Sequence, residues 1–279
     1  MFEIATISYT DPGAPAAFAR SLRETGFAVL TDHPIAAERI EATYAGWGVF
    51  FNSEHKHDFT VNPDRQDGYF PFRSENAKDS PVKDLKEFYH VYPDGRLPDE
   101  LEAVTRQMYA DLVGIGQTLL DWIQDETPRA VTARLSEPLP DMLEGSRQNL
   151  LRILHYPAVA APPEPGAVRA AAHGDINLIT VLLAGSAPGL EARDTAGHWH
   201  AVPCDPGMIA INAGDMLEMA SGGYYPSTVH RVVNPETTDR GARFSMPMFL
   251  HPRPDVVLAP GTTADDFLNE RLREIGLKT

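Results

Sequence analysis

The sequence of 279 residues is 43% hydrophobic and 23% charged, which is ordinary for a globular protein with a sizeable core, and its net charge of −15 argues against nucleic acid or an anionic membrane as a partner. A single cysteine, Cys204, excludes an internal disulfide and is typical of a reducing compartment. Residues 1–12 do not resemble a secretory signal, and no apolar run approaches the roughly 18 residues of a membrane span, so we expect a soluble cytoplasmic protein.

Helix and strand signals alternate at the start of the chain. We predict a helix from Asp11, a favourable N-cap residue, to Gly26, which suits a helix end. The run GFAVLTDHPI that begins at Gly26 predicts a buried strand, and residues 36–51 predict a second helix. Between Asn52 and Pro98, prolines and glycines interrupt a series of aromatic residues, which indicates a long loop-rich stretch of the kind that often serves function.

A long amphipathic helix is predicted from Asp99 to about Glu126. Its apolar residues recur at steps of three or four and form one stripe, as in a helix that lies across a sheet. The stripe consists of Leu101, Val104, Met108, Leu112, Ile115, Leu119 and Ile123.

From Asn149 onward the period changes to short β-prone runs separated by Gly, Pro, Asn and Asp. Many short strands without intervening helices predict an antiparallel sandwich or barrel. A last helix is expected from Thr263, because the Thr-x-x-Asp spacing to Asp266 resembles a capping box. The strand runs are LLRILHY, INLITVLL, GLEAR, WHAVP, MIAINA, VHRVVN and RFSMPMFL, and the apolar positions of the last helix are Phe267, Leu268, Leu272 and Ile275.

We therefore expect an α+β fold in which a mostly helical region, residues 1–145, covers a jelly-roll core. Residues 146–279 would form this core together with the C-terminal helix. Both parts are expected to belong to one compact unit.

One His-x-Asp occurs in the sequence, at His173-Gly174-Asp175, and His230 follows 55 residues after Asp175. Two imidazoles and one carboxylate can bind one face of an iron(II) ion and leave the other face open for substrate and O₂. The alternative is that these are three unrelated polar residues at strand ends. We favour the metal triad because suitable anion-binding residues follow it.

Two further histidine pairs have strand spacing. They are His198 with His200, and His55 with His57. Neither pair has a carboxylate at ligand spacing, so we interpret the first as a hairpin edge and the second as a solvated helix end.

Arg243 and Ser245 follow His230 on an apolar run, and their spacing places both side chains on one face of a strand. A buried guanidinium needs an anionic partner, which is either a protein carboxylate or a ligand carboxylate. Bidentate pairing suits the distal carboxylate of 2-oxoglutarate. Tyr156 could add a phenol donor or be a core residue, and Arg240, a rival arginine in the run ETTDRGA, is expected to be solvated.

These pieces together resemble the isopenicillin N synthase-like iron(II)/2-oxoglutarate-dependent dioxygenases, over almost the whole chain. The resemblance implies a double-stranded β-helix core, His173, Asp175 and His230 as iron ligands, and Arg243, Ser245 and Tyr156 around 2-oxoglutarate. Two residues depart from the family pattern: Leu154 stands where Asn is common, which removes one 2-oxoglutarate contact, and Gly174 stands where Thr is common. The motifs are GFAVLTDHPI, GYFPF, DLKEFYH, RILHYP, HGD, GDMLEMASGGYYPSTVHRV and RFSMPMFLHP.

The implied activity is oxidation, most simply hydroxylation, of a small organic substrate with Fe(II), O₂ and 2-oxoglutarate, giving succinate and CO₂. An iron oxidase of the isopenicillin N synthase type that uses no 2-oxoglutarate is one alternative. A catalytically silent jelly-roll binding protein is another. We expect a monomer or a weak homodimer.

The substrate pocket is expected to be roofed by aromatic residues of the irregular stretch, Tyr69, Phe70 and Phe72, with Phe249 completing its wall. The alternative is that these aromatics pack the N-terminal half onto the sheet. Gly222 and Gly223 precede His230 and either allow close backbone approach to the site or form a plain turn.

Overall fold

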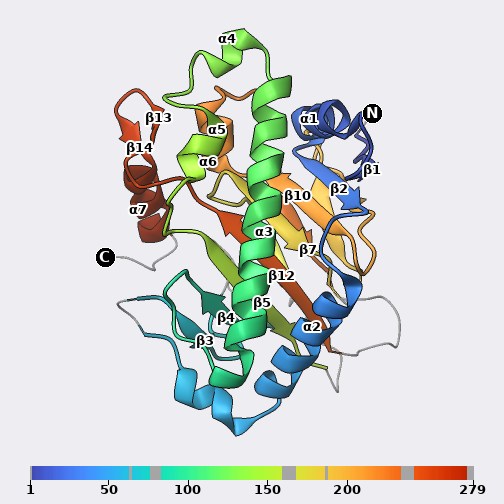
Figure 1. Cartoon of the computed structure of the whole chain (residues 1–279), viewed down its shortest axis with the longest axis vertical. Helices are drawn as coiled ribbons and strands as arrows, with labels where there is room; N and C mark the ends of the chain where they lie inside the picture. Colours follow the sequence, from blue (N-terminus) through green and yellow to red (C-terminus); the bar gives the residue numbers. More distant parts are fainter. Residues whose placement is uncertain are drawn as a thin grey trace.

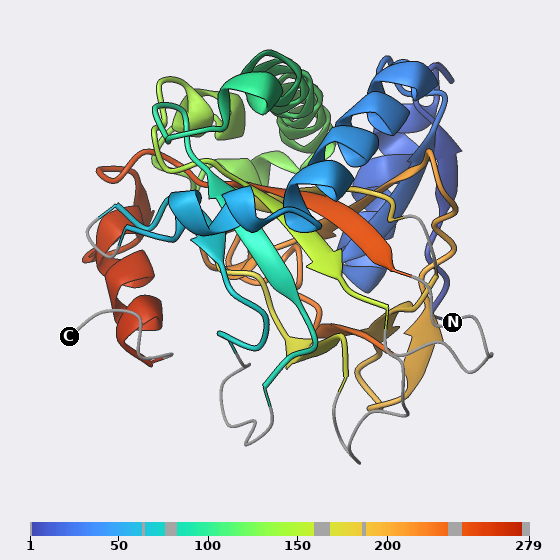
Figure 2. The same cartoon turned by 90° about the horizontal axis from the view of Figure 1, so that it is seen from below.

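Two β-sheets face each other at the centre of the molecule, and helices cover the outer face of the larger sheet (Figures 1 and 2). A computed structural model gives this fold. It describes residues 2–62, 65–75, 83–158, 168–185, 188–233 and 242–274.

Among the described residues the larger sheet has eight strands, and only its first pair, β1 and β2, is parallel. Its spatial order is β1 (Thr6–Ser8), β2 (Phe27–Thr31), β10 (Ile209–Ala213), β7 (Ile179–Leu183), β12 (Arg243–Leu250), β5 (Leu150–Tyr156), β4 (Glu87–Val91) and β3 (Gly68–Phe70).

The smaller sheet is antiparallel and lies on the side of the large sheet opposite to the helices (Figure 2). Its order is β6 (Ala170–His173), β11 (His230–Val232), β8 (Leu190–Arg193) and β9 (Trp199–Ala201). The two facing sheets form the jelly-roll core of an α+β fold, as the strand pattern and the family resemblance predicted.

The helices fall into a long central one and several shorter ones. They are α1 (Ala14–Thr25), α2 (Ala37–Phe51), α3 (Asp99–Glu126), α4 (Arg129–Thr132), α5 (Leu139–Leu143), α6 (Asp215–Ala220) and α7 (Ala264–Glu274), with a 3-10 helix η1 (Glu54–Phe59) and a hairpin of β13 (Val257–Ala259) and β14 (Thr262–Thr263). Within the described residues, no helix is both long and apolar enough to cross a membrane.

The predicted helix over Asp99–Glu126 is confirmed, and α3 crosses the large sheet (Figure 1). Alternate residues of the central strands point toward it and form the main core, such as Leu151 and Ile153 of β5. One position of the predicted stripe differs. Thr105 is fully buried where Val104 was expected, because its hydroxyl accepts a hydrogen bond from the Trp47 indole at 3.1 Å.

Two other expectations were wrong or incomplete. Asp11 does not cap α1; the N-cap is Gly13, whose amide donates to the Asp11 carboxylate before the helix begins. Residues 52–98 are not all loop, since β3 and β4 extend the large sheet there. All five residues of β4 are buried on both faces, so the run EFYHV shows no alternation that would reveal a strand.

The remaining helix signals were correct. Gly26 ends α1 with a left-handed φ of 73°, which favours glycine. The capping box is present, because the Thr263 amide donates to the Asp266 carboxylate and the Asp266 amide to the Thr263 hydroxyl. Ile275 lies outside the described residues.

Two glycines of α3 provide a test of how closely this helix packs on the sheet. A Cβ on Gly116 would lie 1.9 Å from a Cδ atom of Leu250 and 3.3 Å from its Cγ, whereas a Cβ on Gly114 would meet nothing within 4 Å. Alanine favours a helix by about 1 kcal/mol over glycine, but overpacking a core costs about 1–3 kcal/mol. We expect Gly114→Ala to raise the free energy of unfolding, measured by urea denaturation. The free energy of unfolding of Gly116→Ala should lie about 1–3 kcal/mol below that of Gly114→Ala. Equal effects of the two changes would show that α3 does not need this close approach.

Candidate metal centre

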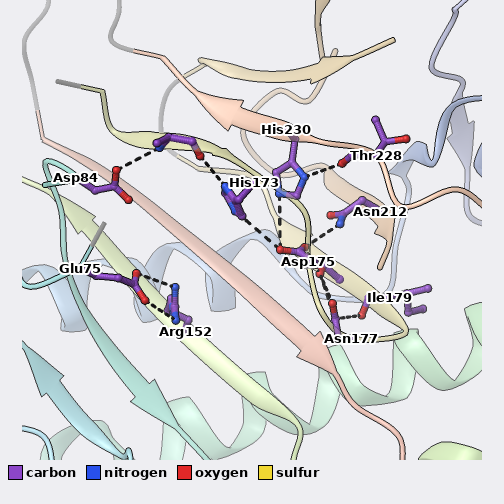
Figure 3. Close-up of polar contacts among 12 residues, drawn as sticks. Glu75, Asp84, Arg152, His173, Asp175, Asn177, Ile179, Asn212, Thr228 and His230 are labelled. Carbon is purple, nitrogen blue, oxygen red and sulfur yellow. Dashed lines mark hydrogen bonds and ion pairs between the residues drawn. The ribbon is translucent and has the colours of Figure 1, made fainter. Parts of the chain in front are cut away.

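The small sheet brings together the two histidines of the predicted triad. His173 ends β6, His230 begins β11, and the two residues are direct partners in the antiparallel ladder. Asp175 follows β6 by two residues and is buried. Figure 3 shows the three side chains converging.

Each imidazole is oriented by a backbone carbonyl. His173 Nδ1 bonds to Ala171 O at 2.7 Å, and His230 Nδ1 bonds to Thr228 O at 3.1 Å. Both Nε2 atoms therefore point at Asp175 Oδ1, from 3.9 Å and 3.8 Å respectively. The carbonyls hold the proton on Nδ1 and leave Nε2 as a lone-pair donor, which is the form that ligates a metal.

The carboxylate of Asp175 is held by the large sheet. Its Oδ2 accepts hydrogen bonds from the Thr180 hydroxyl at 2.5 Å and the Asn212 amide at 2.8 Å. Burial alone would raise the pKa of the Asp175 carboxyl, but the neighbouring histidines and these hydrogen bonds lower it below its ordinary value. Burial, followed by the proximity of His230, lowers the pKa of His173 to about 4. At neutral pH the site thus has a carboxylate and a neutral His173, a donor set that fits a divalent ion.

The other histidine pairs do not form such a group. His55 and His57 lie on η1 with about half of each side chain exposed, as expected for a solvated helix end. Contrary to expectation, each pair has a carboxylate nearby: Asp58 bonds His55 Nδ1 at 2.9 Å, and at the β8–β9 hairpin Asp194 bonds His200 Nε2 at 2.7 Å. Among the residues described, only His173, Asp175 and His230 bring three ligand atoms within 4.8 Å of one another.

Arg243 and Ser245 lie on β12 with their side chains on the interior face, and both are buried. The Arg243 guanidinium lies 5.3 Å from the ring centre of Tyr156, its partner on β5. A Cβ on Gly185 would come within 3.1 Å of Arg243 Nε and 2.4 Å of the Phe244 carbonyl oxygen, so only glycine leaves room for this guanidinium. The structure thus brings together the three residues expected around an anion.

A small cavity borders the Arg243 guanidinium between the two sheets. It is lined on the large sheet by Leu182 and Ala184 and on the other side by Leu190, Val202 and Cys204. Leu154 is the register partner of Ser245 and supplies an apolar surface there. Arg240 lies outside the described residues.

The predicted substrate residues divide between the two faces of the sheet. Phe70 lies on the interior face, stacked on Phe88 with ring centres 4.5 Å apart, and Phe249 faces the same side. The prediction for Tyr69 is wrong: its ring is buried in the helix-side core and its hydroxyl donates to Glu87 at 2.5 Å. Phe72 is 43% exposed in the turn after β3. Packing, the alternative considered for these aromatics, therefore holds for Tyr69.

The glycines before His230 form a plain turn. Gly222 and Gly223 have φ values of 65° and 83°, which side chains disfavour.

Several interior polar residues were not found by sequence reasoning. Arg152, Lys86 and His90 project from β5 and the neighbouring β4 region, and His251 follows β12 with its buried Nδ1 lacking a hydrogen-bond partner in the described structure. No motif marks them. A signal was present for Arg152, since a cation within the apolar run LLRILHY needs a reason to be there.

Comparisons with known proteins are consistent with this site. Residues 147–252 match the model of the 2OG-Fe(II) oxygenase superfamily, and residues 10–110 match the N-terminal model of non-haem dioxygenases in morphine synthesis. A proline hydroxylase from Petromyces alliaceus is 31% identical, over 91% of this chain and 89% of that protein.

Two crystal structures are similar over nearly their whole length. A protein from Shewanella oneidensis assigned as an oxygenase is 50% identical, with a TM-score of 0.90 and coverage of 98% of this chain and 99% of that one. A protein from Caulobacter crescentus assigned to the 2OG-Fe(II) oxygenase family is 32% identical, with a TM-score of 0.81 and the same coverage.

The buried His251 gives a pH-dependent prediction for the metal-free protein. Burial lowers the pKa of its imidazole to about 4, whereas an unfolded histidine titrates near 6.5. The unfolded state therefore binds a proton that the folded state does not bind. As a result, the free energy of unfolding falls as the pH drops from about 6.5 to about 4. We expect His251→Gln to reduce this loss, by up to about 3 kcal/mol, in urea denaturation with a chelator at pH 7 to 4.5. His198→Gln, at an exposed side chain, is the control. An unchanged pH slope for His251→Gln would contradict the neutral, buried state of this imidazole.

Proposed function

The chain belongs to the 2OG-Fe(II) oxygenase superfamily, and we propose that it holds Fe(II) through His173, Asp175 and His230 to hydroxylate a small organic substrate. The observation that carries the ligand assignment is the convergence of two Nε2 atoms on the Asp175 carboxylate, from 3.8 Å and 3.9 Å. Three protein ligands on one side leave the remaining positions of an iron ion open.

The protein's residues have distinct parts in this activity. Thr180 and Asn212 fix the rotation of the Asp175 carboxylate, and the carbonyls of Ala171 and Thr228 fix the imidazole tautomers. When bound, iron and 2-oxoglutarate supply the oxidising chemistry with O₂, and 2-oxoglutarate is converted to succinate and CO₂. The protein places the substrate beside the open face and limits the access of water.

We assign the 2-oxoglutarate side of the cavity to Arg243, Ser245 and Tyr156. The planar guanidinium suits the distal carboxylate, and Ser245, two residues along the same strand, adds a hydroxyl donor. Arg243 is buried between the sheets, so the ion pair with 2-oxoglutarate would be shielded from water. Leu154, beside Ser245, has an apolar side chain and offers no amide contact to 2-oxoglutarate.

The relatives support the use of 2-oxoglutarate over the two alternative functions considered for this sequence. An iron oxidase without 2-oxoglutarate would form no succinate, and a silent binding protein would take up no iron. We further propose that the protein acts in the cytoplasm as a monomer or weak homodimer, with the single cysteine in support of a reducing compartment.

Removal of one imidazole should abolish iron binding. We expect His230→Ala and His173→Ala to lose anaerobically reconstituted iron and O₂-dependent succinate formation, while circular dichroism stays that of the wild type. Thr180→Val, which removes the hydroxyl that donates to Asp175 and also bonds Asn177, should weaken iron affinity by about 10–100-fold. His55→Ala, at an exposed histidine, is the control. Wild-type iron content in either triad variant would reject the assignment.

Loss of the guanidinium should weaken 2-oxoglutarate binding selectively. Charge-assisted bidentate pairs contribute roughly 1.5–3 kcal/mol, so Arg243→Ala should raise the 2-oxoglutarate concentration for half-maximal turnover by at least ~10-fold. Ser245→Ala should have a smaller effect, and Arg193→Ala, at an exposed end of β8, should have none. Iron affinity measured in parallel should not change. An unaltered 2-oxoglutarate requirement in Arg243→Ala would show that another residue holds the distal carboxylate.

A further inference from the structure

The interior side of the large sheet carries charged residues that neither the metal centre nor the Arg243 site uses. We call them the Arg152 cluster: Arg152 and Lys86 are its cations, Glu75 and Asp84 its carboxylates, and His90 its neutral member. Every member is largely buried, with 24% of the Glu75 side chain and 18% of the Arg152 side chain exposed. Buried charges beside a catalytic site are costly, and they mark candidate binding residues.

Arg152 is held in one orientation. Its guanidinium lies 4.6 Å from the ring centre of Phe88 and 5.6 Å from that of Phe249. Its Nε donates to His90 Nε2 at 2.8 Å. The two rings and the imidazole position the guanidinium before any ligand arrives, which lowers the entropy that binding must overcome.

The terminal nitrogens of Arg152 make weaker contacts. They face the Glu75 carboxylate at 3.3 Å and 3.5 Å, whereas Lys86 Nζ contacts the same carboxylate at 2.9 Å. Glu75 would therefore stay paired with Lys86 if another carboxylate took its place on Arg152. Burial raises the pKa of Glu75, but the opposite effect of Arg152 and Lys86 is larger, and the net pKa lies below its ordinary value. Glu75 is therefore an anion and contacts Arg152 as an anionic ligand would.

The Arg152 cluster is connected to the metal centre by a chain of polar contacts. Lys86 Nζ contacts Asp84 at 2.9 Å, and Asp84 accepts the amide of Ala171 at 3.2 Å. The carbonyl of Ala171 in turn bonds His173 Nδ1.

The register of the strands in the large sheet also places Arg152 near the metal centre. Phe249, beside Arg152, is the ladder partner of Thr180, whose hydroxyl donates to Asp175. A ligand on Arg152 would therefore lie on the metal side of the sheet.

We propose that Arg152 anchors a carboxylate of the prime substrate, with Glu75 as the group that this carboxylate displaces. This inference rests on the proposed function and names its substrate class: a small carboxylic acid whose apolar or aromatic part packs against Phe88 and Phe249. Arg152 is a specificity-determining residue, distinct from Arg243. Glu75 lowers the affinity for the substrate while it keeps the guanidinium paired when no substrate is bound.

A purely structural cluster would respond differently to substitution. If the ion pairs served only to fix residues 71–75 on the sheet, both Arg152→Gln and Glu75→Gln would weaken ligand binding through lost order. If Glu75 competes with the substrate, Glu75→Gln should tighten the binding of carboxylates. The two substitutions would then change the affinity for carboxylates in opposite directions.

The test uses the full chain with Fe(II) and saturating 2-oxoglutarate under anaerobic conditions, so that Arg243 is occupied. Benzoate, phenylacetate and 3-phenylpropionate are each compared with the matching primary amide by isothermal titration calorimetry. We expect at least one acid to bind at least ~10-fold more tightly than its amide, as a charge-assisted bidentate contact would give. Arg152→Gln should remove this preference, Arg152→Lys should reduce it, and Glu75→Gln should increase acid affinity several-fold.

The affinity for 2-oxoglutarate is measured first in the same wild-type samples. Absence of 2-oxoglutarate binding would reject the proposed function. Normal 2-oxoglutarate binding without any preference for acids over amides would reject this inference alone. It would also be rejected if Arg152→Gln kept the preference, or if Glu75→Gln weakened acid binding as much as Arg152→Gln does.

Discussion

The Asp175 carboxylate joins the two sheets, and the geometry of the metal centre depends on it. Its Oδ2 accepts hydrogen bonds from Thr180 and Asn212 of the large sheet, while its Oδ1 faces both imidazoles of the small sheet. Because the two oxygens have different partners, the carboxylate cannot rotate without breaking hydrogen bonds. Burial raises the pKa of the Asp175 carboxyl, but His230 and His173, followed by the two hydrogen-bond donors, lower it below its ordinary value and keep the group ionised.

Local periodicity was enough to predict the elements that have one apolar, buried side and one polar, more exposed side. The stripe of Asp99–Glu126 gave both bounds of α3, and spacing together with family resemblance singled out a histidine pair and a carboxylate that the fold places together. The β4 strand was missed because it is covered on both sides and its sequence does not alternate. Tyr69 and Phe70 show a second limit: adjacent strand residues face opposite ways, and only the register decides which of them faces the cavity.

Two buried charge networks lie on opposite faces of the same strands, and their surroundings distinguish them. On the helix side, Glu87 accepts hydrogen bonds from Tyr69 and Lys56 and bonds His155. These partners fix a carboxylate within the packed core, where no ligand could reach it. On the side that faces the small sheet, the Glu75 carboxylate contacts Arg152 at 3.3 Å and is shared with Lys86 at 2.9 Å. A network that is fully bonded stabilises the fold, whereas one with long, exchangeable contacts beside an open site is suited to binding.

The strongly acidic chain must nevertheless attract anionic ligands. At physiological ionic strength the Debye length is about 8 Å, so exposed carboxylates contribute little to the potential deep between the sheets. The field there is set by the interior charges, because screening of buried charges is much weaker. Arg243 and Arg152 lie on neighbouring strands of the same interior face, with the register pair Phe249 and Thr180 leading from Arg152 to Asp175. The net charge of −15 is therefore compatible with the binding of small anions between the sheets.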